Sequence, residues 1–437
     1  MIACYYALGG INYKNGVITT CPRQSDQLVF ARQTIIPSEI YNHENFTNLR
    51  KKLYNDQWPT GCSTCQEMEK YNLKSMRHDY FLDKNNVFNK NDGDLFTEPT
   101  DYKLMDCYDP STHKVAKEGL RHLEFRFSTA CNFACLHCSE VYSSGWKKKL
   151  NNFTVDAEVK AYNLRQLLGT EHRHGPNDKE EMRLTTEQAL KICEDLNENF
   201  PYLQYIDFAG GELLYQKQFF PTLRKLAEHP NAKNMLISFH SNFNADFDIS
   251  ELTSLLKPFK ESCIIISVDA GKNIYPYFRH GGKWEKLKSN IEEFKKINDF
   301  TWIDTSITTS VYQILDIYDV FESILSLNCN LDASLVQTPQ YINPSILKYD
   351  FKDDVLKDFN KTEEMLNKSK SKVIEGTRGA RYWLKYIFDY IDNTKLDYSH
   401  YNRFLVYRKK SDQIWNQNFN DYFVNYQIDD NELVRVN

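Results

Sequence analysis

The chain has 437 residues, 41% of them hydrophobic and 26% charged, with a formal net charge of −5. This composition is that of a globular protein long enough for one large domain with appended modules. The acidic balance argues against a nucleic acid partner, and the lack of any apolar run near ~18 residues argues against a membrane partner. Because the N-terminus lacks a basic region followed by an apolar core, we expect a cytoplasmic protein, whose eleven cysteines are metal ligands or buried thiols.

Four cysteines lie near the start of the chain. Cys4 and Cys21 flank a predicted β-hairpin over residues 10–18, whose Asn-Gly turn is a strong hairpin signal. Cys62 and Cys65 form a C-x2-C pair that follows a predicted helix. Four thiolates can close a tetrahedral zinc site or hold a complete iron–sulfur cubane, and the residues alone leave both interpretations open.

A second cysteine motif follows a strand-like run over residues 121–127. Cys131, Cys135 and Cys138 form a C-x3-C-x2-C cluster. A cubane has four irons, usually ligated by thiolates, so three cysteines on one loop leave one iron open to a small molecule. A zinc site that borrows His137 or a distant ligand, and a chance cluster of cysteines, are the alternatives.

Strand-like and helix-like runs alternate from this point onward. Strands are predicted over residues 121–127, 202–208, 234–240, 263–269, 302–310 and 330–336. Helices are predicted over residues 185–199, 216–228, 249–256, 284–298 and 313–327. The alternation predicts an α/β fold with a parallel sheet wound by crossover helices. Where such a sheet closes into a β/α barrel, the catalytic residues lie at the carboxyl ends of the strands.

Polar and glycine residues follow three of these strands. They are Gly210, Gly211 and Glu212 after the second strand, Ser241 and Asn242 after the third, and Asp269 and Arg279 after the fourth. Glycines let a ligand approach the backbone, and a guanidinium fork suits a carboxylate. The ordinary alternatives are a strand-to-helix turn with a solvated glutamate and a surface arginine.

The cysteine spacing and the Gly-Gly-Glu segment resemble the radical S-adenosylmethionine (radical SAM) superfamily. The resemblance implies a partial (β/α)6 TIM-like barrel and a [4Fe–4S] cluster on Cys131, Cys135 and Cys138 that binds SAM. It further implies contacts to SAM from Gly210, Gly211 and Glu212 (amino group), Arg279 of the Asp269 stretch (carboxylate), Ser241 and Asn242 (methionine or ribose) and His137 (adenine). Phe243 stands where the family has a glycine, which weakens the Ser241 and Asn242 assignment.

The first 75 residues resemble the twitch domain, the shortened relative of the SPASM domain that carries an auxiliary cluster in many radical SAM enzymes. The resemblance implies a second, auxiliary [4Fe–4S] cluster on Cys4, Cys21, Cys62 and Cys65, with zinc as the competing interpretation. Such domains usually follow the barrel, but the N-terminal order occurs among uncharacterised twitch-containing radical SAM proteins, many from phages. Their cysteine loop often continues with serines and a tryptophan, as residues 143–146 do here.

Four segments are expected. They are a cluster-binding domain at 1–75, a linker at 76–119, the core barrel at 120–340 and an aromatic-rich, mainly helical extension at 341–437 that packs on the barrel. The polar stretch 151–184 is either a lid or a surface excursion. Cys107 in the linker is either a substrate-facing thiol or an inert loop cysteine.

The resemblance implies an enzyme that cleaves SAM reductively to a 5′-deoxyadenosyl radical, which abstracts hydrogen from a peptide or protein for oxidation, crosslinking or a related modification. Radical tailoring of a small molecule, sugar or nucleotide is the alternative within this chemistry. A non-catalytic metal-binding interaction protein is the alternative from another class. The expected partners are the substrate and an electron donor such as flavodoxin or ferredoxin.

Overall fold

A computed structural model describes most of the chain. The described residues are 2, 4–14, 16–22, 24, 28–30, 33–70, 75, 102–139, 142–152, 183–336, 339–347, 352–368, 380–393, 398–423, 425–429 and 432–436. Much of the predicted linker and nearly all of the stretch 151–184 lie outside these residues, so the lid hypothesis for that stretch stays a prediction.

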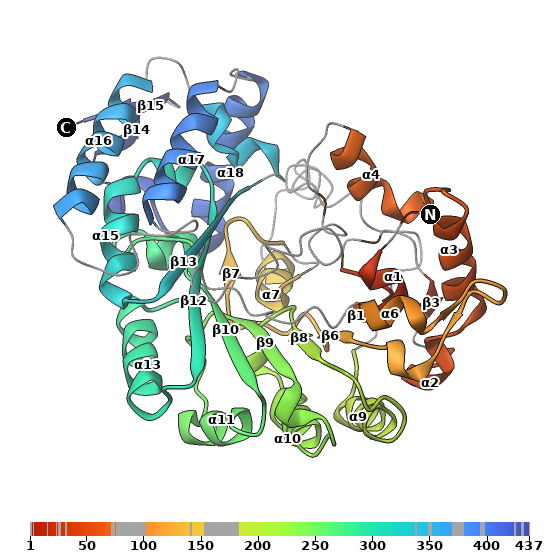
Figure 1. Cartoon of the computed structure of the whole chain (residues 1–437). Helices are drawn as coiled ribbons and strands as arrows, with labels where there is room; N and C mark the ends of the chain where they lie inside the picture. The colour runs from red at the N-terminus through yellow and green to blue at the C-terminus, as the bar shows by residue number, and fades with distance from the viewer. Residues whose placement is uncertain are drawn as a thin grey trace.

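A nine-stranded, mostly parallel sheet forms the centre of the molecule (Figure 1). Its strand order is β13-β12-β10-β9-β8-β6-β1-β2-β3. The pairs from β13 to β1 are parallel, whereas β2 and β3 add antiparallel at one edge. The bounds are β1 (Gly10–Lys14), β2 (Val17–Thr19), β3 (Val29–Phe30), β6 (His122–Arg126), β8 (Tyr205–Phe208), β9 (Leu236–Ser241), β10 (Glu261–Ser267), β12 (Thr301–Thr309) and β13 (Asn330–Leu335).

Crossover helices cover one face of this sheet (Figure 1). They are α9 (Thr186–Asn199), α10 (Phe219–Ala227), α11 (Ile249–Leu256), α13 (Trp284–Ile297) and α15 (Ile317–Leu327). The short helix α14 (Val311–Ile314) lies between β12 and α15 in the chain. Thr185 begins α9 with a capping box to Gln188, and Asn328 ends α15 in the left-handed conformation at φ 50°. The α/β prediction is confirmed, and its six strands and five helices are present, although the last predicted helix is divided into α14 and α15.

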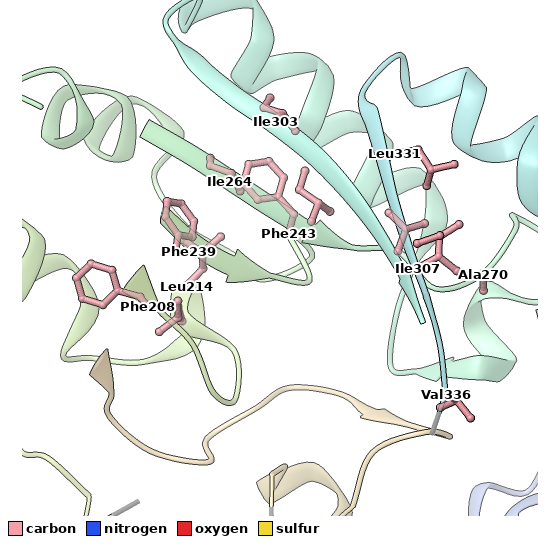
Figure 2. Packing of buried hydrophobic residues seen from close by; sticks show 14 of the residues in the cluster. Phe208, Leu214, Phe239, Phe243, Ile264, Ala270, Ile303, Ile307, Leu331 and Val336 are labelled. Carbon is pink, nitrogen blue, oxygen red and sulfur yellow. The ribbon is translucent and has the colours of Figure 1, made fainter. Parts of the chain in front are cut away.

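The hydrophobic core lies between the sheet and these helices. Phe208, Phe239, Ile264 and Ile303 come from four neighbouring strands and are all buried (Figure 2). Successive side chains in a strand point to opposite faces of the sheet. Every second residue of each strand, counted from these four, therefore faces the helices. The positions between them face the inside of the half-barrel.

The N-terminal segment contains α1 (Tyr5–Gly9), α2 (Pro37–Ile40), α3 (Glu44–Tyr54), η1 (Thr60–Cys62) and α4 (Ser63–Lys70). The predicted hairpin is present, with Lys14 opposite Val17. Sequence reasoning expected this segment to form a small domain beside the barrel. Instead, β1 pairs parallel with β6, with Gly10 opposite His122. Tyr13 of β1 stacks on Phe125 of β6 with 5.7 Å between ring centres, which stabilises this pairing. The N-terminal segment therefore supplies a seventh parallel strand.

The C-terminal extension is mainly helical, as predicted. It comprises η7 (Gln340–Ile342), η8 (Pro344–Ile346), α16 (Lys352–Lys368), α17 (Ala380–Asn393), α18 (Tyr398–Trp415), η10 (Phe419–Asp421) and the hairpin β14 (Tyr426–Asp429) with β15 (Glu432–Arg435). Most of its described aromatic side chains are buried or partly buried, whereas Tyr382 and Tyr386 are exposed. Tyr407 donates a hydrogen bond to the carbonyl of Leu136, so this extension contacts the loop of the three cysteines.

Short elements complete the described chain. They are α6 (Tyr102–Asp106), β4 (Tyr108–Asp109), β5 (Lys114–Val115), η3 (Lys117–Gly119), β7 (Ala134–Cys135), α7 (Ser144–Asn152), η5 (Leu213–Tyr215), η6 (Ala232–Asn234), α12 (Tyr275–Phe278) and β11 (Arg279–His280). Among the described helices, none is both long and apolar enough to cross a membrane.

Candidate active site

The loop of residues 131–138 follows the carboxyl end of β6. Its strand β7 pairs antiparallel with β11, which places Cys135 opposite Arg279 and Ala134 opposite His280. The backbone N–H of Leu136 also donates to the carbonyl of Phe278 over 2.9 Å. The cysteine loop is thus joined to the segment after β10, and the predicted cysteine and arginine sites are brought together.

Residues 143–146 also form hydrogen bonds with the cysteine loop and the residues just before it. Ser144 donates its backbone N–H to the carbonyl of Thr129 over 2.8 Å, and its hydroxyl accepts from the N–H of Cys131 over 3.1 Å. Trp146 is fully buried and donates its indole N–H to the carbonyl of Cys135 over 2.8 Å. The serines and the tryptophan that continue the motif therefore fix the shape of the loop.

The three thiols are close neighbours in a buried environment. Burial raises the pKa of Cys131 to about 11 and that of Cys138 to about 12, and it raises the pKa of Cys135 well above its usual range. Since thiolates are the metal ligands, a bound cation must supply the free energy that deprotonates them. Within the described ranges, no three His, Cys, Asp or Glu side chains converge as ligands of a single metal ion.

Glu212 connects the ends of β8 and β9. Its carboxylate accepts hydrogen bonds from the hydroxyl of Ser241 at 2.7 Å, the backbone N–H of Asn242 at 2.6 Å and the N–H of Leu214 at 3.1 Å. Burial raises its pKa, and only 1% of the residue is exposed. The predicted residues Glu212, Ser241 and Asn242 therefore form one cluster, and a carboxylate has room for one further donor.

Asp269 and Arg279 form a buried ion pair beside the cysteine loop. Arg279 donates from Nη1 to Asp269, and its guanidinium lies 5.5 Å from the ring centre of Phe133. The Nε of Arg279 is buried and has no hydrogen-bond partner. A buried, unpartnered guanidinium N–H is costly, and it fits a ligand carboxylate.

His137 lies next to this ion pair. Its Nε2 is 3.5 Å from Asp269 Oδ2, and its ring stacks on Phe278 with 5.1 Å between ring centres. Burial lowers the pKa of His137, so the ring is neutral near pH 7, and its Nδ1 has no partner. Nε2 is directed at Asp269, whereas Nδ1 could still ligate a metal, so the zinc interpretation that borrows His137 stays open.

Gly210 and Gly211 have positive φ angles of 86° and 61°, and they lie against Arg126 of β6 and against Ala130, the residue before the cysteine loop. A Cβ on Gly211 would lie 2.3 Å from the carbonyl oxygen of Ala130. Its neighbour Glu212 donates its N–H to that same carbonyl over 2.8 Å. Three thiols on one loop, a backbone cradle and the unpartnered Nε of Arg279 together fit a three-thiolate iron–sulfur cluster and a small ligand that carries a carboxylate.

Two residues of this site escaped the sequence reasoning. Gln216 is buried, donates to the carbonyl of Gly210 over 2.9 Å and accepts from the hydroxyl of Ser128 over 2.9 Å. Asn132 accepts from the side-chain amide of Asn242 over 2.8 Å. Polar residues so near the Gly-Gly-Glu and cysteine motifs were the available signal, but the bonds of Gln216 to Ser128 and of Asn132 to Asn242 join residues that are far apart in the sequence.

Cys107 does not face the cysteine loop. It is half-buried beside Gly119, and its pKa is raised by burial with Arg121 and Glu118 nearby. These residues precede β6, whereas the cysteine loop follows the carboxyl end of that strand. The structure therefore corrects the idea of a substrate-facing thiol, because Cys107 lies at the opposite end of β6.

The four N-terminal cysteines line one pocket, together with Trp58 and Thr20. Cys4 precedes α1, Cys62 ends η1 and Cys65 lies in α4. Burial raises the pKa of Cys4 to about 12, and the nearby Cys62 and Cys65 add to the effect. Cysteines from three segments of the N-terminal region thus line one pocket, and the assignment of all four to one metal site stays a prediction.

A larger pocket of about 700 Å³ opens on the outside of the cysteine loop. Cys131 lines it, as do Lys148 and Lys149 of α7 and His280 and Trp415. Trp415 stacks on His280 with 4.2 Å between ring centres and lies 4.9 Å from the Lys149 ammonium. The pocket therefore brings a basic surface next to a cysteine of the loop.

One protein-family model matches part of the chain. Residues 125–311 match the radical SAM superfamily. No curated protein matches the chain. Among solved structures, native anSMEcpe with bound AdoMet is similar at 17% identity over 63% of this chain and 63% of that chain, with a TM-score of 0.37.

Two further structures are similar at a lower TM-score. Streptococcus suis SuiB bound to precursor peptide SuiA has 12% identity over 74% of this chain and 62% of that chain, with a TM-score of 0.33. TYW1 with a lysine-pyruvate adduct bound has 17% identity over 70% of this chain and 90% of that chain, with a TM-score of 0.29. The chain thus spans less than two thirds of the length of anSMEcpe and of SuiB.

The two glycines allow a matched test of the cradle. Gly211→Ala and Gly210→Ala both place a side chain at positive φ, which costs about 1–2 kcal/mol. Only the former adds a clash, because a Cβ on Gly210 meets nothing nearer than 3.4 Å. We expect Gly211→Ala to lower the free energy of unfolding more than Gly210→Ala and to reduce retained iron. Equal losses in denaturant titrations would contradict the close approach of Gly211 to Ala130.

Proposed function

We propose that this chain, an enzyme of the radical SAM superfamily that cleaves SAM, modifies a side chain of a peptide or protein. The observation that carries the proposal is the meeting of Cys131, Cys135 and Cys138 with the Glu212 cluster and Arg279 at one edge of the sheet. When bound, a [4Fe–4S] cluster with SAM supplies the radical that abstracts hydrogen from an unreactive C–H bond.

Each protein group has a role in binding and orienting SAM. The three thiolates would hold the cluster and leave one iron open. Arg279 would offer its unpartnered Nε to the SAM carboxylate while Asp269 fixes the other end of the guanidinium. Glu212 would accept a hydrogen bond from the SAM amino group, and the ring of His137, stacked on Phe278, would provide a flat surface for adenine.

The choice of a peptide substrate rests on the N-terminal cysteines, whose spacing resembles the twitch and SPASM domains. We assign to Cys4, Cys21, Cys62 and Cys65 an auxiliary [4Fe–4S] cluster, since all four line one pocket. Four thiolates complete the ligand set of a cubane, so this cluster would have no open iron for a substrate. Its role would then be to receive an electron from the substrate, which gives an oxidised or crosslinked product.

An acidic electron carrier of the flavodoxin or ferredoxin type is the proposed reductant. Lys148 is exposed, Lys149 lies near it, and both line the pocket that reaches Cys131. Complementary charge accelerates the encounter of two proteins, and docking here brings the donor close to the cluster.

The first prediction concerns SAM. With dithionite and SAM, the reconstituted protein should release 5′-deoxyadenosine, and Cys135→Ala should release none. Arg279→Lys keeps the charge but loses the guanidinium fork, so the Kd for SAM should rise about tenfold or more, as for a lost charge-assisted hydrogen bond of about 1.5–3 kcal/mol. The control is Arg224→Lys on the exposed end of α10. An unchanged Kd with iron intact would remove Arg279 from the SAM site.

The second prediction is an iron count. Two cubanes require about eight irons per chain, and Cys62→Ala with Cys65→Ala should lower this to about four while SAM cleavage stays detectable. Cys193→Ala, on the buried face of α9, is the control and should keep the full count. Stoichiometric zinc with about four irons in the wild-type protein would show that the four-cysteine pocket is a zinc site.

The third prediction concerns the donor. Lys148→Glu with Lys149→Glu should slow SAM cleavage driven by reduced flavodoxin about tenfold or more at low ionic strength, because like charges then face each other. Turnover with dithionite should be unaffected. The exposed pair Lys233→Glu and Lys257→Glu controls for net charge. If both pairs of substitutions slow the reaction equally, the donor docks elsewhere.

A further inference from the structure

One buried donor in the four-cysteine pocket is left without a partner. Gln24 is 3% exposed, and it lines this pocket together with Cys4, Cys21, Cys62 and Cys65. Among the residues that the structure describes, the side-chain Nε2 of Gln24 has no hydrogen-bond partner. Buried polar atoms are nearly always paired, so this amide nitrogen fits an acceptor that arrives with a bound group.

Thr20 fixes the orientation of the Gln24 amide. The backbone N–H of Thr20 donates to Oε1 of Gln24 over 3.1 Å, and the Thr20 hydroxyl donates to the same oxygen over 2.9 Å. A backbone N–H can only donate, so the atom that faces it is the amide oxygen and not the nitrogen. Nε2, on the other arm of the amide, is therefore directed away from Thr20.

A turn of the chain places Gln24 beside Cys21. The backbone N–H of Gln24 donates to the carbonyl of Cys21 over 3.3 Å, and the hydroxyl of Thr19 donates to the same carbonyl over 2.9 Å. Thr20, which orients the amide, directly precedes Cys21 in the chain. The donor and one of the proposed metal ligands are thus held by the same turn.

The surroundings of the cysteines contain few other polar side chains. Besides Gln24, Thr20 and Thr64, the described side chains that line the pocket with the cysteines are apolar or aromatic, namely Tyr6, Ala7, Leu49, Leu53 and Trp58. A hydrogen bond to a charged atom is stronger in such a medium than in water. One amide N–H therefore has a large effect on a negatively charged group bound here.

We infer that Gln24 donates a hydrogen bond from Nε2 to a sulfur atom of the metal centre in this pocket, either a bridging sulfide of a cubane or a metal-bound thiolate. The inference rests on the proposed function, because it takes the pocket as the site of the auxiliary cluster. A hydrogen bond to sulfur stabilises the reduced, more negative form of a cluster and so raises its reduction potential. Gln24 would thus help the auxiliary cluster to receive an electron from the substrate.

The test measures the potential of the auxiliary cluster alone. Replacing Cys131, Cys135 and Cys138 by Ala removes the other cluster, and the full chain is then reconstituted with iron and sulfide. In this background, Gln24→Leu should make the ratio of reduced to oxidised cluster about tenfold smaller at a fixed potential, which is a shift of about 59 mV for one electron. Gln57→Leu, at an exposed position of the N-terminal segment, is the control and should cause no shift. Equal potentials of the two variants, with iron intact, would overturn the inference.

Two further measurements separate a hydrogen bond from a change in packing. After exchange into deuterium oxide, electron–nuclear double resonance of the reduced cluster should show the loss of one exchangeable proton in Gln24→Leu, and an unchanged set of protons would contradict the inference. Thr20→Val removes the hydroxyl that orients the amide, whereas Thr20→Ser keeps it, so only Thr20→Val should lower the potential. If Gln24→Leu fails to bind iron, this pair decides, and equal potentials overturn the inference.

The metal content separates this inference from the proposed function. Uptake of zinc in place of iron would refute the auxiliary cluster, and Gln24→Leu and Gln57→Leu are then compared for zinc affinity by competition with a chelator. Loss of a hydrogen bond to a ligand sulfur should weaken zinc binding about tenfold or more in Gln24→Leu alone. Equal zinc affinities would overturn the inference as well. An iron–sulfur cluster whose potential does not depend on Gln24 refutes only this inference.

Discussion

The pairing of β7 with β11 is the interaction on which the site depends. Two residues of the cysteine loop form a ladder with Arg279 and His280, which are far away in the sequence. A loop that carries three buried thiols would otherwise be free to choose among many conformations, at a cost of about 1–2 kcal/mol for each residue that ligand binding must order. The ladder, the Ser144 contacts and the Trp146 hydrogen bond restrict the conformations of the loop.

The parallel sheet brings the site residues together at one of its edges. In-register parallel strands bring the ends of β6, β8, β9 and β10 to one edge, so the cysteine loop, Glu212, Asn242 and Asp269 meet although they are spread along the chain. Strand β1 extends the sheet beside β6, and the stacking of Tyr13 on Phe125 makes that extension part of the core. The N-terminal cysteines are therefore attached to the barrel through a rigid element.

Local sequence patterns predicted much of the fold and of the candidate site. The features that depend on contacts between residues far apart in the sequence could not be predicted in this way. The period of apolar residues located six strands of the parallel sheet and their helices, and the C-x3-C-x2-C spacing located the loop of the three cysteines. The pairing of β1 with β6 was missed, because a hairpin signal such as Asn-Gly reports only on neighbouring residues. The roles of Gln216 and Asn132, and the bond from Tyr407 to Leu136, were hidden for the same reason, since each joins segments that no periodicity connects.

The two cysteine sites lie at different ends of neighbouring strands. Cys21 follows Thr19, which is paired with Asn12 near the start of β1, and a Cβ on Gly10 would touch the carbonyl of Thr20. The four-cysteine pocket is thus beside the amino end of β1, whereas Cys131 follows the carboxyl end of the parallel strand β6. The row of Asn12 and Glu124 lies between the edge that carries Cys131 and the four-cysteine pocket. If that pocket holds the proposed auxiliary cluster, the length of β1 and β6 separates the two clusters, which suits the transfer of electrons between them rather than joint ligation of one substrate.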